Sequence, residues 1–192
     1  MKKGLVIVIS APSGAGKTTV IREFLKSHKQ DFVISVSATT RKPRKGERNG
    51  RDYFFLSKRR FRELVKKGSF LEYARVLSNY YGTMKKTVLT HINKGKNVIM
   101  DIDVQGAAKI RRSMGKDCVT VFLMPPSFAE LKKRLQNRRT EPQKEVKKRL
   151  NLAKKELKEK DKYDYIVVNK DLKKAALELE KIYRKESEKR IA

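Results

Sequence analysis

The chain has 192 residues, with 49 Lys or Arg against 21 Asp or Glu, and this length suits one domain with smaller lobes attached. The resulting net charge of +28 predicts attraction of anionic partners, among which nucleotides, nucleic acid and anionic lipid all qualify. No apolar run is long enough to span a membrane, no cleavage site follows Met1–Lys3, and the single cysteine, Cys118, cannot form an internal disulfide, so we expect a cytoplasmic protein.

The chain begins with a strand, a loop of small residues and a helix. The short apolar run LVIVIS (5–10) predicts a buried strand, and TTVIREFLKSH (18–28) has helical spacing at Val20, Phe24 and Leu25. A strand-to-helix turn of this kind lies at the edge of a parallel sheet where α/β proteins bind ligands.

The loop itself matches a phosphate-binding pattern. Residues 11–18, A-P-S-G-A-G-K-T, follow G-x-x-x-x-G-K-[ST] except that Ala11 replaces the first glycine. Gly14 and Gly16 allow backbone N–H groups to converge on phosphate oxygens, and the helix start adds its positive dipole end. Lys17 would contact the β and γ phosphates and the Thr18 hydroxyl would ligate Mg²⁺, whereas the alternative is an ordinary glycine-rich turn.

The next region departs from a strand-helix alternation. FVISVS (32–37) predicts a second strand, and a polar loop (38–52), a short strand YFFL (53–56), a helix (57–68) capped by Ser57 and a strand FLEYARVL (70–77) follow. Strands packed this closely predict a small mixed lobe inserted in the parallel core.

A cluster of cationic and phenolic side chains in that lobe suggests a second phosphate site. Arg41, Arg44 and Tyr53 could together hold a phosphate monoester, because arginine binds phosphate through two parallel hydrogen bonds. The alternative is a solvated basic loop, although Pro43 and Gly46 should stiffen it.

The rest of the chain alternates strands with helices. NVIMDID (97–103), CVTVFLM (118–124) and YDYIVV (163–168) predict buried strands, and the helices 104–114 and 172–185 lie between and after them. A helix pair within 131–150 has NRRTEP (137–142) at its middle, a predicted hinge or flap with Pro142 at the start of the second helix. The fold class is therefore α/β, with a parallel sheet flanked by helices.

Several stretches together resemble the guanylate kinase family over nearly the whole chain. They are SAPSGAGKTT, SVSATTRKPRKGERNGRDYFF, FLEYA, NYYGT, DIDVQGA, PPS and IVVN, in this order. The resemblance implies a P-loop NTPase core at 1–34, 95–126 and 160–192, a GMP-binding lobe at 35–94 and a helical lid at about 127–159. It also implies transfer of the γ-phosphoryl group of ATP, with Mg²⁺, to GMP and dGMP in purine metabolism.

The resemblance also implies residue roles on the acceptor side. Because guanine offers N1–H and an exocyclic amine, the Glu72 carboxylate could accept from both, with Asp103 taking the amine's other proton; without the resemblance, a half-buried strand-edge acid would be the favoured interpretation of Glu72. The guanine would be surrounded by Ser37, Glu72, Thr83 and Asp103, and the GMP phosphate held by Arg41, Arg44, Tyr53 and Tyr81.

On the donor side the resemblance implies an ATP site formed by the loop, the lid and the last strand. Asp101 would hold Mg²⁺ through water, and Asn169 would contact the adenine. The catalytic set would be Lys17, Arg44, Arg138 and Arg149, with Arg139 able to share the role of Arg138 because it stands where the family usually has glycine. The remaining ATP-binding residues would be Ala11, Pro12, Ser13, Gly14, Ala15, Gly16, Thr18, Thr19 and Arg134.

Two other functional classes fit parts of the sequence. An interaction module with a guanylate-kinase-like fold would lack a working phosphate loop, yet Lys17, Thr18, Arg44 and the lid arginines are present. A nucleic-acid-binding protein would explain the charge, but the basic residues lack the aromatic interleaving of a stacking platform. A specific nucleic-acid partner is therefore not expected, and the sequence leaves a monomer and a homodimer open.

Overall fold

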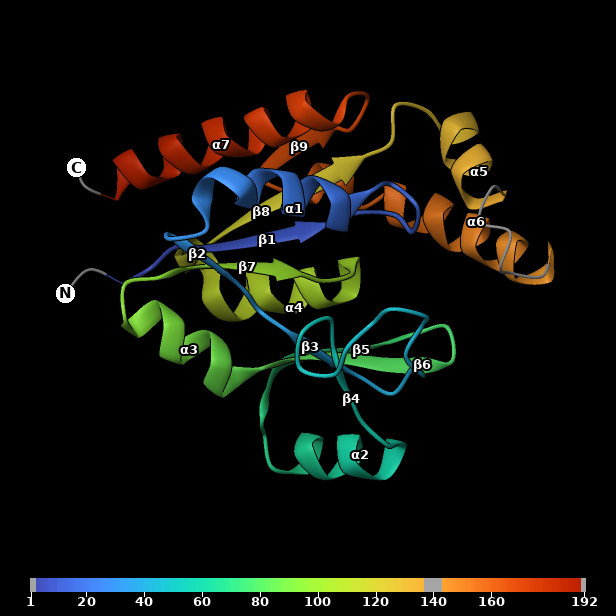
Figure 1. Cartoon of the computed structure of the whole chain (residues 1–192), viewed down its shortest axis with the longest axis horizontal. Helices are drawn as coiled ribbons and strands as arrows, with labels where there is room; N and C mark the ends of the chain where they lie inside the picture. The colour runs from blue at the N-terminus through green and yellow to red at the C-terminus, as the bar shows by residue number, and fades with distance from the viewer. Residues whose placement is uncertain (1–2, 137–142, 191–192) are drawn as a thin grey trace. The chain divides into compact units, whose positions relative to one another are not determined.

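The computed structural model of the chain describes residues 3–136 and 143–190 as an α/β protein with two sheets (Figure 1). The larger sheet has five strands in the order β2-β7-β1-β8-β9, and the β2–β7 and β8–β9 pairs are parallel. Its strands are β1 (Val6–Ser10), β2 (Phe32–Ile34), β7 (Asn97–Asp101), β8 (Cys118–Met124) and β9 (Tyr165–Val168).

The smaller sheet is mixed, as the sequence predicts for the inserted lobe. Its order is β4-β3-β6-β5, with β3 parallel to β4 and antiparallel to β6. Its strands are β3 (Ser37–Thr39), β4 (Phe54–Phe55), β5 (Phe70–Val76) and β6 (Asn79–Met84).

The helices that the structure describes agree with the predicted segments and add one, α3, that the sequence pattern did not predict. Ser57 caps α2 as expected, since its Oγ accepts a hydrogen bond from Arg60 N at 3.1 Å. No described helix combines the length and apolarity needed to cross a bilayer. The α-helices are α1 (Lys17–His28), α2 (Lys58–Lys66), α3 (Lys85–Asn93), α4 (Val104–Met114), α5 (Phe128–Gln136), α6 (Gln143–Leu157) and α7 (Leu172–Lys189), with 3₁₀ turns at Gly115–Asp117 and Lys160–Lys162.

Burial along the strands explains why the larger sheet is parallel. All five residues of β1 are buried, as are the first six of β8, so neither strand has a polar face. Strands that are apolar on both faces belong in the interior of a parallel sheet.

The prediction of a single strand at 32–37 is wrong, because the chain changes sheets within it. Phe32–Ile34 pairs with β7, and Ser35 N still donates to Ile99 O at 2.9 Å, but Ser37 pairs with Thr83 of β6. A short apolar run does not indicate which strand its backbone will pair with.

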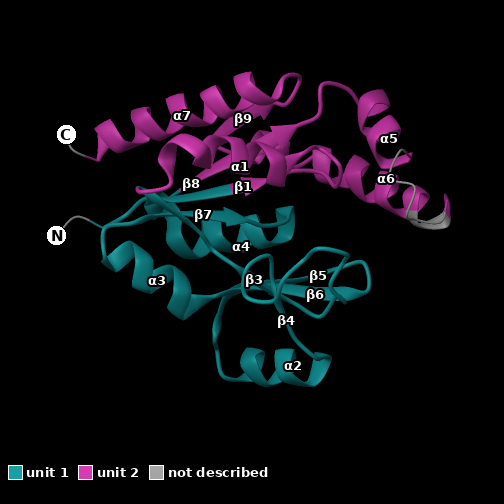
Figure 2. Ribbon diagram, viewed as in Figure 1, with its two compact units in different colours: residues 1–8, 31–118 teal, residues 9–30, 119–192 magenta. Residues whose placement is uncertain are grey.

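The chain forms two compact units (Figure 2). Unit 1 comprises residues 1–8 and 31–118, and unit 2 comprises 9–30 and 119–192, so the division falls inside β1. In unit 1, α3 packs on β7 and α4 packs on β5. In unit 2, α1 packs against α7, where the rings of His28 and Tyr183 meet edge to face at 5.9 Å.

Candidate active site

The phosphate loop between β1 and α1 has the backbone that its glycines predict. Gly14 and Gly16 have φ of +93° and +88°, a left-handed conformation that glycine adopts without steric cost. Ala15 N donates to Pro12 O at 3.0 Å, which closes the turn. Gly16 is the N-cap of α1 and offers no side chain to the first turn, which also contains no acidic residue. The positive end of α1 is therefore suited to an anion.

Asn169, which follows β9, is attached to this loop. Its Nδ2 donates to Ala15 O at 2.8 Å, and the residue is only 7% exposed. A Cβ on Gly16 would lie 2.6 Å from the same nitrogen, so glycine is required there for the contact as well as for its φ. The buried amide holds the loop backbone in place, and an adenine contact by Asn169 stays a prediction.

Helices α5 and α6 lie beside the phosphate loop within unit 2. Arg149 of α6 donates from Nη1 to Ser13 Oγ at 2.9 Å. A Cβ on Gly14 would lie 3.0 Å from Leu135 and 3.1 Å from Leu131, both on α5. The two helices are joined by a buried cluster of Leu131, Leu135 and Ala153.

Of the other predicted lid arginines, the structure describes Arg134 alone. Arg134 is on α5, where its Nε donates to Glu130 Oε1 at 3.0 Å, so in this structure its charge is paired within the helix. Arg138 and its neighbour Arg139 lie outside the described residues.

In unit 1, three of the residues predicted to surround guanine form one row across the small sheet. Ser37 is paired with Thr83, and Thr83 is paired with Glu72, so the row runs from β3 through β6 to β5. Directly opposed residues in antiparallel strands share a face. All three residues are buried, and Thr83 Oγ1 donates to Glu72 Oε1 at 2.8 Å.

A register shift in β5 places Glu72 in that row. Phe70 is opposite Met84, yet Glu72 is opposite Thr83, so β5 carries one extra residue at this point. Without the bulge Glu72 would face Gly82, and the carboxylate would leave the row. Bulges of this kind re-aim side chains beside functional sites.

The fourth guanine candidate, Asp103, lies at the start of α4. Its Oδ1 accepts hydrogen bonds from Gln105 N at 2.7 Å and Gly106 N at 3.0 Å, which caps the helix. Glu72 approaches the same turn, because a Cβ on Gly106 would lie 2.6 Å from Glu72 Oε2. The two carboxylates therefore lie near each other beside the first turn of α4.

Burial raises the pKa of Glu72 to about 7, and the nearby Asp103 charge adds to the effect, while the hydrogen bond from Thr83 and the charge of Lys109 oppose it. Glu72 is 5% exposed, which makes ionisation costly in the free protein. A ligand that donates two hydrogen bonds to this carboxylate would favour the ionised form.

The predicted phosphate-binding residues also meet in unit 1. The Arg41 guanidinium lies over the Tyr53 ring, 5.3 Å from its centroid, and the Tyr53 and Tyr81 rings are 6.0 Å apart. Burial raises the pKa of Tyr53 to about 12, and the Asp101 charge contributes, so its hydroxyl stays protonated and can donate. Arg44 is exposed on the same loop.

The sequence interpretation missed one residue of this cluster, Glu47. Its carboxylate accepts from Arg41 Nη2 at 2.8 Å, from Arg41 Nη1 at 3.0 Å and from Arg44 N at 2.7 Å. The available signal was compositional, because Glu47 is the single acid in the run from Lys42 to Arg51.

The structure thus assigns the predicted residues to two groups. Every residue predicted for GMP lies in unit 1 together with Asp101, and every described residue predicted for ATP lies in unit 2 together with Arg149. Among the described residues no group of three His, Cys, Asp or Glu could hold a metal ion.

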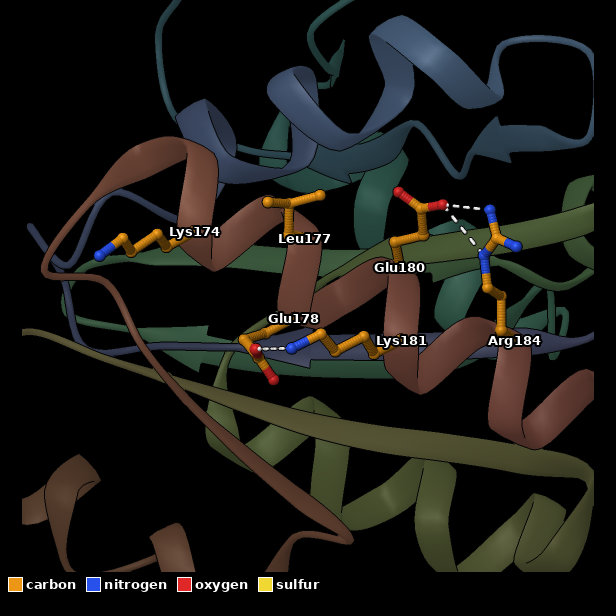
Figure 3. Close-up of a pocket in the computed structure, with 6 residues that line it drawn as sticks. All are labelled: Lys174, Leu177, Glu178, Glu180, Lys181 and Arg184. Atoms are coloured by element: carbon orange, nitrogen blue, oxygen red, sulfur yellow. Dashed lines mark hydrogen bonds and ion pairs between the residues drawn. The ribbon is translucent and has the colours of Figure 1, made fainter.

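A shallow pocket on α7 contains none of these residues (Figure 3). Two ion pairs run along the helix in its lining, with Lys181 Nζ 2.7 Å from Glu178 Oε1 and Arg184 Nη2 2.6 Å from Glu180 Oε1. The lining residues are Lys174, Leu177, Glu178, Glu180, Lys181 and Arg184.

Comparison with known proteins gives a consistent result. The sequence model described as guanylate kinase matches residues 3–186. The guanylate kinase of Clostridioides difficile (strain 630) is 46% identical over 189 residues, which cover 98% of this chain and 91% of that protein. The guanylate kinase of Wolbachia pipientis wMel is 44% identical, over 98% of this chain and 94% of that protein.

Solved structures agree with the sequence comparisons. The crystal structure of guanylate kinase from Anaplasma phagocytophilum superimposes with a TM-score of 0.82 at 34% identity, over 97% of this chain and 87% of that one. Shikimate kinase from Bacteroides thetaiotaomicron has a TM-score of 0.53 at 17% identity, a likeness of fold alone.

Proposed function

The chain belongs to the guanylate kinase family, and from that premise we propose how its residues divide the transfer of a phosphoryl group from ATP to GMP. The chain is a guanylate kinase, whose reaction yields ADP and GDP. We further propose that it accepts dGMP and that it acts in the cytoplasm in purine nucleotide metabolism.

The row of Ser37, Thr83 and Glu72 is the observation that best supports guanine as the base. An ionised carboxylate has about four acceptor sites, and Thr83 occupies one of those on Glu72. The remaining sites suit the N1–H and amine of guanine, with Asp103 as a second acceptor for the amine. Adenine has an unprotonated N1 and would leave the remaining acceptor sites of the buried carboxylate unfilled, which costs roughly 1 to 3 kcal/mol.

The phosphate of GMP would be held by Arg41, Arg44, Tyr53 and Tyr81. Two guanidinium groups can bind its oxygens in pairs, and the protonated Tyr53 hydroxyl can donate to a third. Arg41, Tyr53 and Tyr81 would bind the phosphate equally in the ground and transition states, so their loss should mainly raise the KM for GMP, whereas Arg44 also belongs to the predicted catalytic set.

The phosphates of ATP would be held by the loop at 11–19. Its backbone N–H groups and the start of α1 would bind the phosphate oxygens, and Lys17 would neutralise charge that develops in the transition state. Arg149, which already contacts Ser13 of the loop, would approach the same phosphates together with Arg134 and Arg138. Phosphoryl transfer depends on positioning and charge neutralisation, so no protein base is required.

The Thr18 hydroxyl and the Asp101 carboxylate are oxygen donors that suit Mg²⁺, which binds few protein groups and several phosphate or water oxygens. These two residues would hold the ion, Asp101 through water. When bound with ATP, Mg²⁺ neutralises phosphate charge.

The proposal is tested by measuring ADP release with GMP, dGMP, AMP, CMP and UMP as acceptors. We expect turnover with GMP and dGMP, and efficiency at least about a hundredfold lower with AMP, because two buried contacts are lost. Absence of turnover with GMP would refute the assigned reaction, and equal turnover with AMP would refute the role of Glu72.

The division of roles has its own test. Lys17→Ala should lower kcat strongly, by roughly a hundredfold or more, because it removes a transition-state contact. Arg41→Ala should mainly raise the KM for GMP, because it removes a contact made in both the ground and transition states. The opposite pattern would contradict the division.

A further inference from the structure

The loop that carries Arg41 and Arg44 is organised around the carboxylate of Glu47. Glu47 Oε2 accepts from both Arg41 Nη1 at 3.0 Å and Arg44 N at 2.7 Å, and Glu47 N donates to Arg44 O at 3.0 Å. One side chain thus fixes the guanidinium of the first arginine and the backbone of the second.

These bonds occupy a particular edge of the Arg41 guanidinium. Its five N–H groups lie in one plane. Glu47 takes the inner hydrogens of Nη1 and Nη2, and Lys42 O accepts from Nη1 at 2.7 Å. Neither residue bonds Nε, and the Tyr81 side chain is a further hydrogen-bond partner of this guanidinium. The edge formed by Nε and Nη2 has the spacing that two phosphate oxygens require.

Aromatic rings and burial restrict the same guanidinium further. It lies 5.3 Å from the ring centroid of Tyr53 and 5.8 Å from that of Phe55. The side chains of Arg41 and Glu47 are 15% and 19% exposed, so the pair is largely desolvated. Burial would raise the pKa of Glu47, but the hydrogen bonds from Arg41 and Arg44 outweigh it and lower this pKa, which keeps the carboxylate ionised.

We propose that Glu47 is a positioning residue of the GMP site: it holds Arg41 by one edge so that the other edge is presented to the acceptor phosphate, and it fixes the Arg44 loop beside it. This inference deepens the proposed function and rests on it.

The alternative action of a carboxylate beside two arginines is competition with the phosphate. Removing the charge of Glu47 would then strengthen GMP binding, because a phosphate dianion would face one more uncompensated positive charge. The geometry opposes competition, since the carboxylate and a phosphate can occupy different edges of Arg41. Positioning and competition therefore predict changes of opposite sign.

The test compares Glu47→Ala and Glu47→Gln with the unmodified protein in steady-state kinetics and in calorimetric titrations with GMP and guanosine. For Glu47→Ala we expect the KM for GMP to rise roughly ten- to thirtyfold, because the long Arg41 side chain regains its rotamer freedom and must lose it again when GMP binds. The kcat and the KM for ATP should be nearly unchanged. Glu47→Gln keeps one acceptor oxygen, so its KM for GMP should rise less than that of Glu47→Ala. Guanosine affinity should not change in either variant, because guanosine has no phosphate.

A matched control is Glu63→Ala, which removes another carboxylate paired with arginine in the same unit. Glu63 Oε2 accepts from Arg60 Nη1 at 3.0 Å on α2, and its side chain is 43% exposed. This variant should leave the KM for GMP unchanged. In the Arg41→Ala background, Glu47→Ala should add little, since Glu47 acts largely through Arg41.

The outcomes separate the two levels of the hypothesis. A lower or unchanged KM for GMP in Glu47→Ala, or a full additional loss in the Arg41→Ala background, would overturn the positioning role while the proposed function stands. If the unmodified protein binds GMP no more tightly than guanosine, the proposed phosphate site is wrong, and the positioning role of Glu47 is wrong with it.

Discussion

Glu72 combines two demands that oppose each other within one side chain. In the proposed guanine site it would have to be ionised to accept two hydrogen bonds, yet it is 5% exposed and burial raises its pKa to about 7. The carboxyl is thus partly protonated near neutral pH in the free protein, and a protonated carboxyl cannot accept from both guanine donors with both oxygens.

The pH dependence of catalysis should report this ionisation. We expect kcat/KM for GMP to rise as the pH increases from about 6 to about 8, because kcat/KM follows the groups of the free enzyme and the pKa of Glu72 is about 7. The phosphate of GMP titrates nearby, with a second pKa of about 6. Glu72→Gln separates the two, because it should lower kcat/KM and retain only the phosphate transition; an unchanged profile in this variant would assign the pH dependence elsewhere.

The same group makes stability depend on pH with a defined sign. The pKa of Glu72 is higher in the folded chain than its ordinary value of 4.5, so between about 4.5 and about 7 the folded state binds more protons than the unfolded state. Stability therefore falls as the pH rises through this window. We expect Glu72→Gln to raise the Tm at pH 8 relative to the unmodified protein, and to have little effect at pH 4.5. Thermal melts at both pH values test this, and an equal change at both would contradict it.

Residue contacts differ in how far the sequence predicts them. The family resemblance named Glu72 and Thr83, and the structure brings them together at 2.8 Å. The sequence pattern did not single out Glu47 in its basic loop, because its contact with Arg41 depends on a turn that brings the carboxylate back to the guanidinium. Asn169 was predicted at the adenine, whereas its contact with Ala15 O depends on how the end of β9 lies against the phosphate loop.

At the scale of elements, α4 and β5 together position the Glu72 carboxylate. The bulge in β5 turns it into the row with Thr83, and the absence of a side chain at Gly106 lets it approach the first turn of α4. Gly106 is inside a helix, where glycine is less favourable than alanine by about 1 kcal/mol. Its presence there is explained by the space that Glu72 occupies.

Gly106→Ala should separate stability from binding. A methyl group would lie 2.6 Å from Glu72 Oε2, so the carboxylate must move, and we expect the KM for GMP to rise roughly tenfold while the KM for ATP is unchanged. The Tm should be unchanged or higher, because alanine favours the helix. Ser113→Ala, in the same helix, is the control and should leave the KM unchanged. An unaltered KM in Gly106→Ala would show that Glu72 does not need this space.

Strands with a strong apolar pattern of their own were predicted well. Strands whose bounds depend on the neighbouring strand with which they pair were not. β1 and β8 are continuous apolar runs, so their type follows from composition. The segment at 32–37 is equally apolar, yet it is divided between two sheets, because β7 and β6 compete for its backbone. The bulge at Leu71 has no sequence signal either, since it depends on the register with β6.

At the scale of the whole molecule, the residues predicted for the two substrates lie in different compact units. The predicted GMP residues are in unit 1 and the described ATP residues are in unit 2. The predicted division into core, lobe and lid stays a prediction. The sequence could indicate the GMP residues and the ATP residues separately, each through its own motif, since the contacts of each group lie within one unit.

The charge of +28 is a property of the whole chain, and it should act on stability and on substrate capture in opposite directions. Like charges repel in the compact state, and this repulsion is screened by salt, because the Debye length falls from about 30 Å at 0.01 M to about 8 Å at 0.15 M. Attraction of GMP and ATP to the basic protein is screened as well. Raising NaCl from about 0.02 to about 0.3 M should therefore raise the Tm of the ligand-free protein and also raise the KM for both nucleotides.

Lys29→Gln combined with Lys94→Gln provides the matched comparison, because both lysines are exposed and neither is a predicted site residue. Removal of two positive charges should raise the Tm at low salt and have less effect at high salt, where the charges are already screened. Thermal melts and steady-state kinetics across the salt series measure both effects. A Tm that falls as salt increases would mean that attractive pairs, such as Arg184 with Glu180 at 2.6 Å, outweigh the repulsion. Such pairs are exposed, and exposed ion pairs contribute about 0 to 1 kcal/mol each, so we expect the net repulsion of the basic excess to dominate.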